Sequence, residues 1–373
     1  MTAAPRPVGA YDDNGTASNA DQPAVLAPGK PALVIALLLL ALLAMAVIAA
    51  AIGAAGIPLA RLPAALGFPA GTADPALLAR DQLVLWSIRL PRIAMAILIG
   101  ALLAGSGAIM QGLFRNPLAD PSLVGVSSGG ALAVAVTIVI GDRLLAGSQS
   151  ALPFELLPVA AFVGSLVATS ILYRIATQEN RTSIAIFLLG GLAIAALAGA
   201  GIGLLVFVAD DRQLRDVTFW MLGSLGGATW TRAAVIAPFL GAMLLAIPFI
   251  ARGLDLLVFG ESEAFHMGVE VERLKRFAIV LVSAMTGAAV SFAGVIGFVG
   301  IVVPHLLRLA IGPGHRLLLP ASACLGAILL LAADTCARTL AAPAEVPIGI
   351  LTALVGAPFF LAVLLRQRSA IGL

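Results

Sequence analysis

The chain has 373 residues, of which 61% are hydrophobic and only 11% are charged, and its mean hydropathy is +1.07. A soluble domain is about a quarter charged and less than half apolar, so this composition excludes a soluble protein and indicates helices in a lipid bilayer. The net charge of +3 is ordinary for a membrane protein with basic loops, and no basic run with interleaved aromatic residues points to nucleic acid.

The first 30 residues are polar and differ from everything that follows. They are rich in Ala, Pro, Gly and Asn, and they include Asp12, Asp13 and Asp21. A secretory signal peptide would be short and basic before its apolar core. We therefore expect residues 1–30 to form a disordered tail, on the cytoplasmic side of the membrane.

Residues 31–373 contain recurring apolar segments of about 20 residues, the length that a helix needs to cross a bilayer. They predict one all-α polytopic membrane domain with ten transmembrane helices. The expected spans cover residues 32–56, 91–113, 121–141, 156–176, 184–208, 230–251, 275–294, 295–311, 317–337 and 347–366.

The second expected span starts at a pair of arginines around a proline, Arg89, Pro91 and Arg92, and is rich in glycine. In lipid, small residues allow helix backbones to approach closely. This glycine content predicts tight packing against other helices, with a pore lined by small side chains as the alternative. The glycines of this span are Gly100, Gly105, Gly107 and Gly112.

The seventh and eighth expected spans are joined without a polar break. A segment from Phe277 to Ala310 is too long for one span. Gly294, Gly297 and Gly300 predict a bend or close turn within it.

Two segments, one starting at Ala96 and one at Ile279, have a similar pattern. Each follows basic residues, is rich in glycine, and reaches a proline, Pro117 in the first and Pro304 in the second. Because the first runs inward and the second outward, the pattern predicts an inverted repeat, which is common in transporters.

The distribution of basic residues predicts the orientation. With the N-terminus in the cytoplasm, 13 of the 22 Lys and Arg residues fall on the cytoplasmic side. The positive-inside rule favours this orientation. Since the number of expected spans is even, both termini are then cytoplasmic.

Several chemistries lack the residues that they need. There is no P-loop, because the only Gly-Lys pair, Gly29-Lys30, is followed by Pro31. Carboxylates in the middle of spans, which an ion-coupled carrier usually requires, are scarce. No catalytic triad and no set of metal ligands can be assigned. The sequence favours a pathway that is driven by another subunit, which would bind any ATP and Mg.

The ninth expected span contains two cysteines and an ion pair. Cys324 and Cys336 are twelve residues apart, about 18 Å along a helix, which is too far for a disulfide. Asp334 and Arg338 are spaced i, i+4 near the end of the span and can pair with each other.

Two polar segments are expected to form short helices outside the spans. Gly253 to Arg276 mixes charged and apolar residues, a pattern that suits short amphipathic helices lying on a protein partner. Asp210 to Trp230 ends in aromatic residues and glycines and predicts an interfacial helix.

These residues together resemble the FecCD family, the type II permeases of ABC importers for vitamin B12, iron siderophores and heme. The resemblance covers nearly everything beyond residue 85, in the order of the family. The matching segments are RLPR (Arg89–Arg92), Gly100–Gly130, Phe219–Trp230, Phe292–Arg338 and Glu345–Arg368.

The resemblance implies a ten-span type II importer permease fold in a bacterial inner membrane. It also implies a homodimer with one pathway on its axis, two cytoplasmic ATPase subunits and a periplasmic binding protein. The chain itself would bind no cofactor, since ATP and Mg belong to the ATPase subunits.

The resemblance also assigns roles to residues. Arg89, Arg92 and Arg338 would dock the binding protein as exposed guanidinium forks, which suit carboxylates. Thr182 and Ser183 would lie at the cytoplasmic gate. The coupling helices that enter the ATPase would lie within residues 253–273, with Gly253, Leu256, Leu257, Glu261, Phe265, Met267 and Gly268.

The resulting prediction is a permease subunit that moves heme or another iron chelate from periplasm to cytoplasm. The alternatives are the same machine with a ferric siderophore or cobalamin as cargo, an ion-coupled secondary carrier, and a membrane scaffold without transport.

Overall fold

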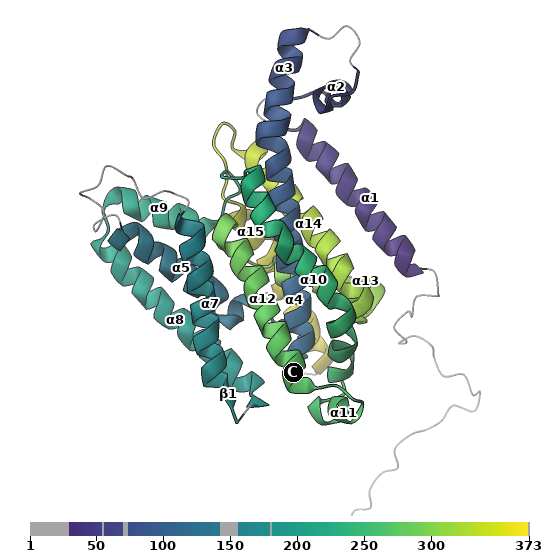
Figure 1. Cartoon of the computed structure of the whole chain (residues 1–373), viewed down its shortest axis with the longest axis vertical. Coiled ribbons are helices and arrows are strands. Elements are labelled where there is room, and N and C mark those ends of the chain that lie inside the picture. Colours follow the sequence, from purple (N-terminus) through teal and green to yellow (C-terminus); the bar gives the residue numbers. More distant parts are fainter. Residues whose placement is uncertain (1–29, 54–55, 70–73, 142–155, 180, 372–373) are drawn as a thin grey trace, which may run out of the picture.

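The structure, a computed structural model, describes residues 30–53, 56–69, 74–141, 156–179 and 181–371 (Figure 1). The expected tail, apart from Lys30, lies outside the described residues. The elements in chain order are α1 (Lys30–Ala51), η2 (Leu59–Arg61), α2 (Leu62–Leu66), α3 (Pro75–Val84), η3 (Leu85–Arg89), α4 (Leu90–Leu113), η4 (Pro121–Val124), α5 (Val126–Val136), η5 (Thr137–Gly141), α7 (Leu156–Ala176), β1 (Thr177–Gln178), β2 (Arg181–Thr182), α8 (Ile184–Val208), α9 (Asp211–Leu222), α10 (Trp230–Leu257), α11 (Glu261–His266), α12 (Val271–Ala293), α13 (Val299–Ile311), α14 (His315–Leu340) and α15 (Ile348–Ile371).

The predicted all-α membrane fold is confirmed. Within the described residues, seven helices are long and apolar enough to cross a membrane. Three shorter apolar helices, Val126–Gly141, Val299–Ile311 and Ile348–Val363, fall in the third, eighth and tenth expected spans. The interfacial helix expected after residue 210 is α9, whose first turn is closed by a capping box between Asp210 and Gln213.

The second span begins much earlier than predicted, because α3, η3 and α4 form one continuous helical segment from Pro75 to Leu113. Asp74 caps its start by accepting a hydrogen bond from the backbone N–H of Ala76 at 2.9 Å. Pro91, which was expected to mark the helix start, is accommodated by the π-helical turn Leu85–Arg89. Arg89 and Arg92 therefore lie inside a long helix and not at its beginning.

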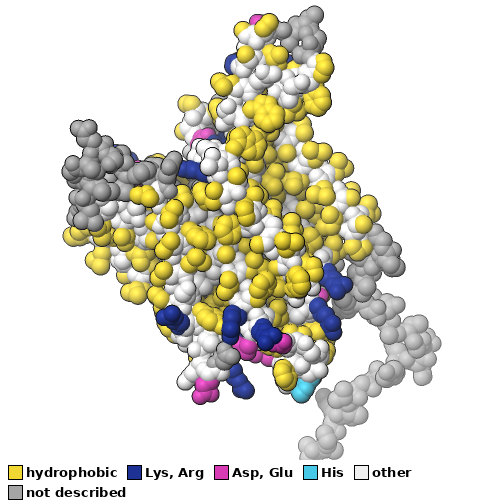
Figure 2. Space-filling model, in the orientation of Figure 1, with side chains coloured by type: hydrophobic (Ala, Val, Ile, Leu, Met, Phe, Trp, Pro, Cys, Tyr) yellow, Lys and Arg dark blue, Asp and Glu magenta, His cyan; other side chains and the backbone are white. Residues whose placement is uncertain are grey.

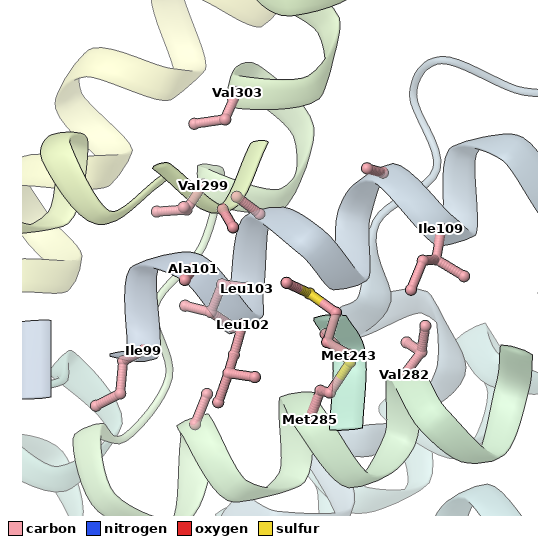
Figure 3. Close-up of a cluster of buried hydrophobic side chains, with 14 of the residues drawn as sticks. Ile99, Ala101, Leu102, Leu103, Ile109, Met243, Val282, Met285, Val299 and Val303 are labelled. Atoms are coloured by element: carbon pink, nitrogen blue, oxygen red, sulfur yellow. The ribbon is translucent and has the colours of Figure 1, made fainter. Parts of the chain in front are cut away.

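Helix α4 runs through the middle of the bundle, and almost every residue from Pro91 to Leu113 is buried. Helices α10, α12, α13 and α14 pack around it (Figure 1). Figure 3 shows Leu102 of α4 near Met243 of α10 and Met285 of α12. The single chain therefore has a filled centre.

Glycine contacts allow α4 to lie so close to its neighbours. A β-carbon at Gly100 would overlap the backbone carbonyl of Gly326 in α14, and one at Gly107 would overlap the carbonyl of Gly300 in α13. Gly326 meets Gly100 in the same way. Tight packing, rather than a glycine-lined pore inside one chain, is the role of these glycines.

Two connections between consecutive spans are short and irregular. The chain between α4 and α5 brings Asp120 and Pro121 against Gly300, and α12 and α13 are joined by residues 294–298. Gly294 and Phe298 have positive φ angles of 72° and 68°, so the predicted bend is confirmed. Each connection therefore joins a long helix to a short one, α4 to α5 and α12 to α13, an order consistent with the expected inverted repeat.

The two ends of the bundle differ in character. One end, which we call the α11 end, contains the last turn of α10, the whole of α11 and the start of α12. The short strands β1 and β2 lie at the same end (Figure 1). Basic and acidic side chains gather there, below a broad apolar surface (Figure 2). The opposite end, which we call the α9 end, carries α9, α2 and the chain between α14 and α15.

The glycine contacts lead to a stability prediction. Gly100→Ala should destabilise the purified protein in detergent by about 1–3 kcal/mol, because the new methyl group overlaps the backbone of α14. Gly241→Ala in α10 is the matched control, since nothing lies within 4 Å of its added β-carbon, and it should be neutral or slightly stabilising. Equal melting temperatures for the two variants would contradict this packing.

Candidate functional site

A cluster of buried charges lies at the α9 end, centred on Arg92. Its Nε donates to both carboxylate oxygens of Asp334 in α14, at 2.9 and 3.1 Å. Its two terminal nitrogens donate to the two oxygens of Glu345, at 2.8 and 2.9 Å. The guanidinium is therefore shared between one buried carboxylate and one that lies half-exposed on the chain between α14 and α15.

Arg89 and Arg338 hold the end of α1. Arg89 donates to the carbonyl of Ala50, and Arg338 donates to the carbonyls of Ile52 and Ala49 at 3.4 and 3.5 Å. The last carbonyls of a helix have no partner within it, and cations are stabilised there. The two arginines thus fix α1 to the rest of the bundle.

The expectation that these three arginines are exposed is wrong. Arg89 is 4% exposed and Arg92 is 8% exposed, and the side chain of Arg338 is 11% exposed. The cause is the longer second span, which places Arg89 and Arg92 among α1 and α14. The predicted pair of Asp334 with Arg338 is confirmed at 3.1 Å.

Glu345 is the residue of this cluster that the sequence did not single out. Its hydrogen bonds from Arg92 lower the pKa of its carboxyl group below the usual value, so the pair persists at neutral pH. A signal was present in the sequence, since Glu345 lies between Pro343 and Pro347 directly before the last span. It borders a cavity of 210 Å³ that Arg89, Arg92 and Arg338 also line.

The segment expected to contain the coupling helices is divided among three helices. Gly253 and Leu257 belong to the end of α10 and are buried, with Gly253 packed against Leu274. The expectation that they lie on a partner surface is therefore wrong, because α10 continues to Leu257. Leu256 and Glu261 are half-buried, and Gly268 is exposed in the turn after α11 with a φ of 85°.

The exposed apolar residues at the α11 end form what we call the α11 surface. They are Val258, Phe259, Phe265 and Met267, which are exposed by 61, 69, 67 and 40%. Val258 and Phe259 lie within the predicted segment 253–273 but were not among the residues assigned to coupling. They directly follow the end of α10, which the sequence did not reveal.

The two predicted gate residues lie close to this surface. Thr182 is buried on β2, and Ser183 caps α8 by accepting a weak hydrogen bond from the N–H of Ile186 at 3.4 Å. The backbone N–H of Thr182 donates to Glu272 at 3.0 Å, and its carbonyl accepts from Lys275 at 3.1 Å. Lys275 also binds Glu261 of α11 at 2.7 Å.

The remaining polar chemistry is limited. Within the described ranges, no group of three or more His, Cys, Asp or Glu side chains could hold a metal ion. Cys324 and Cys336 are both free thiols, as their spacing predicted. His315 binds Asp255 at 2.6 Å and joins the start of α14 to the end of α10.

Comparisons with known proteins agree with this architecture. The profile of the FecCD transport family matches residues 34–366. The hemin transport system permease HmuU of Yersinia pestis is 47% identical over 290 residues, which are 76% of this chain and 83% of HmuU. The cobalamin import permease BtuC of Halobacterium salinarum is 46% identical over 77% of this chain and 74% of its own.

A solved structure is also similar to this chain. It is an inward-facing conformation of a metal-chelate type ABC transporter, with a TM-score of 0.75 and 30% identity. The match covers 90% of this chain and 99% of the solved one.

The charge cluster leads to a second stability prediction. Asp334→Asn should destabilise the protein by about 3 kcal/mol, because two buried guanidinium groups lose their shared carboxylate. The control is Asp216→Asn, which breaks an exposed pair with Arg212 and should cost less than about 1 kcal/mol. Thermal unfolding in detergent measures both, and a small effect for Asp334→Asn would mean that the cluster does not hold this end together.

Proposed function

Since the family profile matches residues 34–366, the chain belongs to the FecCD transport family, and we propose that it imports heme or a similar iron chelate as the permease of an ATP-driven importer. The observation that carries the cargo assignment is the 47% identity to the hemin permease, over 83% of that protein's length. Cobalamin is the second candidate, supported by 46% identity to a cobalamin permease over 74% of its length.

We propose that the pathway lies between two copies of the chain. The centre of one chain is occupied by α4, whose contacts with α13 and α14 are glycine to glycine. A route for a large chelate through this centre would have to displace α4. A homodimer with its pathway on the shared axis avoids that displacement.

We propose that two ATPase subunits bind at the α11 end. The α11 surface exposes two phenylalanines and a methionine beside charged side chains, at an end of the bundle where lipid tails would not cover them (Figure 2). Since the chain has no P-loop, ATP and Mg would be bound by these subunits and no cofactor by this chain. The exposed residues from Val258 to Gly268 would be the ATPase-facing part of a permease domain at 31–373.

The proposed orientation follows from this assignment. The α11 end would face the cytoplasm and the α9 end the periplasm of a bacterial inner membrane, with both termini cytoplasmic. The excess of basic residues expected on the cytoplasmic side supports this orientation.

We propose that the binding protein docks at the α9 end through Arg89, Arg92 and Arg338. Because Arg92 is already held by Glu345, docking on this residue requires an exchange of carboxylates. An acidic side chain of the binding protein would take the place of Glu345, which is the half-exposed partner, while Asp334 stays in place.

The transport proposal is tested by uptake into proteoliposomes that hold this chain, its ATPase and its binding protein. Heme, a ferric siderophore and cobalamin are offered in parallel. We expect uptake of heme or the iron chelate that requires ATP and both partners. Uptake driven by an ion gradient without the ATPase would indicate a secondary carrier and contradict the proposal.

The docking proposal predicts opposite effects from two neighbouring residues. Glu345→Gln should tighten binding of the binding protein, because Arg92 loses its internal competitor. Arg338→Gln should weaken it by about tenfold, the value of one hydrogen bond between charged groups. Surface plasmon resonance at two salt concentrations measures both effects.

Glu179→Gln, in the exposed turn between β1 and β2, is the control for charge alone and should leave the affinity unchanged. Weaker binding of the Glu345→Gln variant would contradict the carboxylate exchange.

A further inference from the structure

Lys275, in the second turn of α12, is buried although it carries a charge. Its side chain is 2% exposed. A buried ammonium group is costly unless carboxylates and hydrogen bonds compensate for the lost water. The groups that bind a buried ammonium therefore have fixed positions relative to one another.

The three partners of Lys275 come from three different parts of the chain. Its Nζ donates to Glu261 at 2.7 Å, to Glu272 at 3.0 Å and to the backbone carbonyl of Thr182 at 3.1 Å. An ammonium group has three donors, so all of them are used. Glu261 is the first residue of α11, Glu272 is on α12, and Thr182 is on the strand that leads into α8.

The position of Thr182 depends on this network. The hairpin that carries it has only two residues in each strand, Thr177–Gln178 and Arg181–Thr182, and a ladder this short is not stable alone. Glu272 accepts from its N–H and Lys275 donates to its carbonyl. Both backbone groups of Thr182 are therefore fixed by α12, and through Lys275 by α11.

Helix α11 is a suitable element to be moved by a partner. Its six residues, Glu261–His266, are too few to form a stable helix in isolation. Glu261 binds Lys275 and Ala264 packs in the core, while Phe265, four residues after Glu261 on the same side of the helix, is 67% exposed. A partner that binds Phe265 therefore acts on Lys275 through about one turn of helix.

We propose that Lys275 is the positioning residue that transmits a displacement of α11 to the strand at Thr182, and so to the start of α8. The proposal rests on the proposed function, in which α11 meets the ATPase and Thr182 and Ser183 lie at the gate. When the ATPase moves α11, the strand must follow, because the alternative is to separate a buried ammonium group from a carboxylate.

The test removes only one interaction of the network, the ion pair between Lys275 and Glu261. Glu261→Gln removes the α11 carboxylate that binds Lys275, while Lys275 keeps Glu272 and Thr182. Glu263→Gln is the matched control on the same helix, because the Glu263 side chain is exposed and makes no hydrogen bond or ion pair with a described residue.

The readout is the reactivity of a reporter cysteine, Ser183→Cys, in a background where Cys324 and Cys336 are replaced by alanine. The assembled complex with the ATPase is labelled with a maleimide, with and without ATP and Mg. ATP hydrolysis is measured on the same samples, which separates a coupling defect from misfolding.

We expect ATP and Mg to change the labelling rate in the unmodified reporter complex and in the Glu263→Gln variant. In Glu261→Gln this change should shrink by about tenfold, the contribution of one hydrogen bond between charged groups. Its ATP hydrolysis should remain within about twofold of the original, because the ATPase site is on another subunit.

Two other outcomes have distinct meanings. If Glu261→Gln labels like the unmodified complex, the inference on Lys275 is overturned and the importer proposal stands. If the unmodified complex hydrolyses ATP without any change in labelling, the gate assignment fails and the inference fails with it.

Discussion

The close approach of α4 to α13 and α14 is the constraint on which the rest of the structure depends. Gly100 meets Gly326, and Gly107 meets Gly300, at backbone contact. In lipid the hydrophobic effect contributes little to the association of helices, so close van der Waals contact supplies the attraction between them. The same α4 carries Arg92 near one end and Gly112, which lies against His315, near the other. One tightly packed helix therefore connects the two ends of the bundle.

Each end of the bundle contains a buried cation held by two carboxylates, one more buried than the other. At the α9 end Arg92 is bound by Asp334 and by the more exposed Glu345. At the α11 end Lys275 is bound by Glu272 and by the more exposed Glu261. We propose that Glu345 is exchanged by the binding protein, whereas Glu261 stays bound to Lys275 and is moved together with α11. This arrangement suits an importer that receives a signal at each face of the membrane.

The sequence predicted the spans well, because apolar length and turn-forming glycines are local properties. The bend at Gly294, the interfacial helix after Asp210 and the pair of Asp334 with Arg338 were all accessible from local spacing. The burial of Arg89 and the links made by Lys275 were not, because they depend on segments far apart in the chain, such as α1, α11 and β2. A sequence motif indicates that an arginine has a role, but only the packed structure shows which residues bind its side chain.

The most direct test of the central claim, that one rigid bundle joins an ATPase at the α11 end to a binding protein at the α9 end, is a cryo-electron microscopy structure of the full assembly. The account predicts that Phe265 and Met267 are buried against the ATPase and that Glu345 has left Arg92 for a carboxylate of the binding protein. An assembly in which the α11 surface stays uncovered, or in which the binding protein sits away from the intact pair of Arg92 with Glu345, would contradict it.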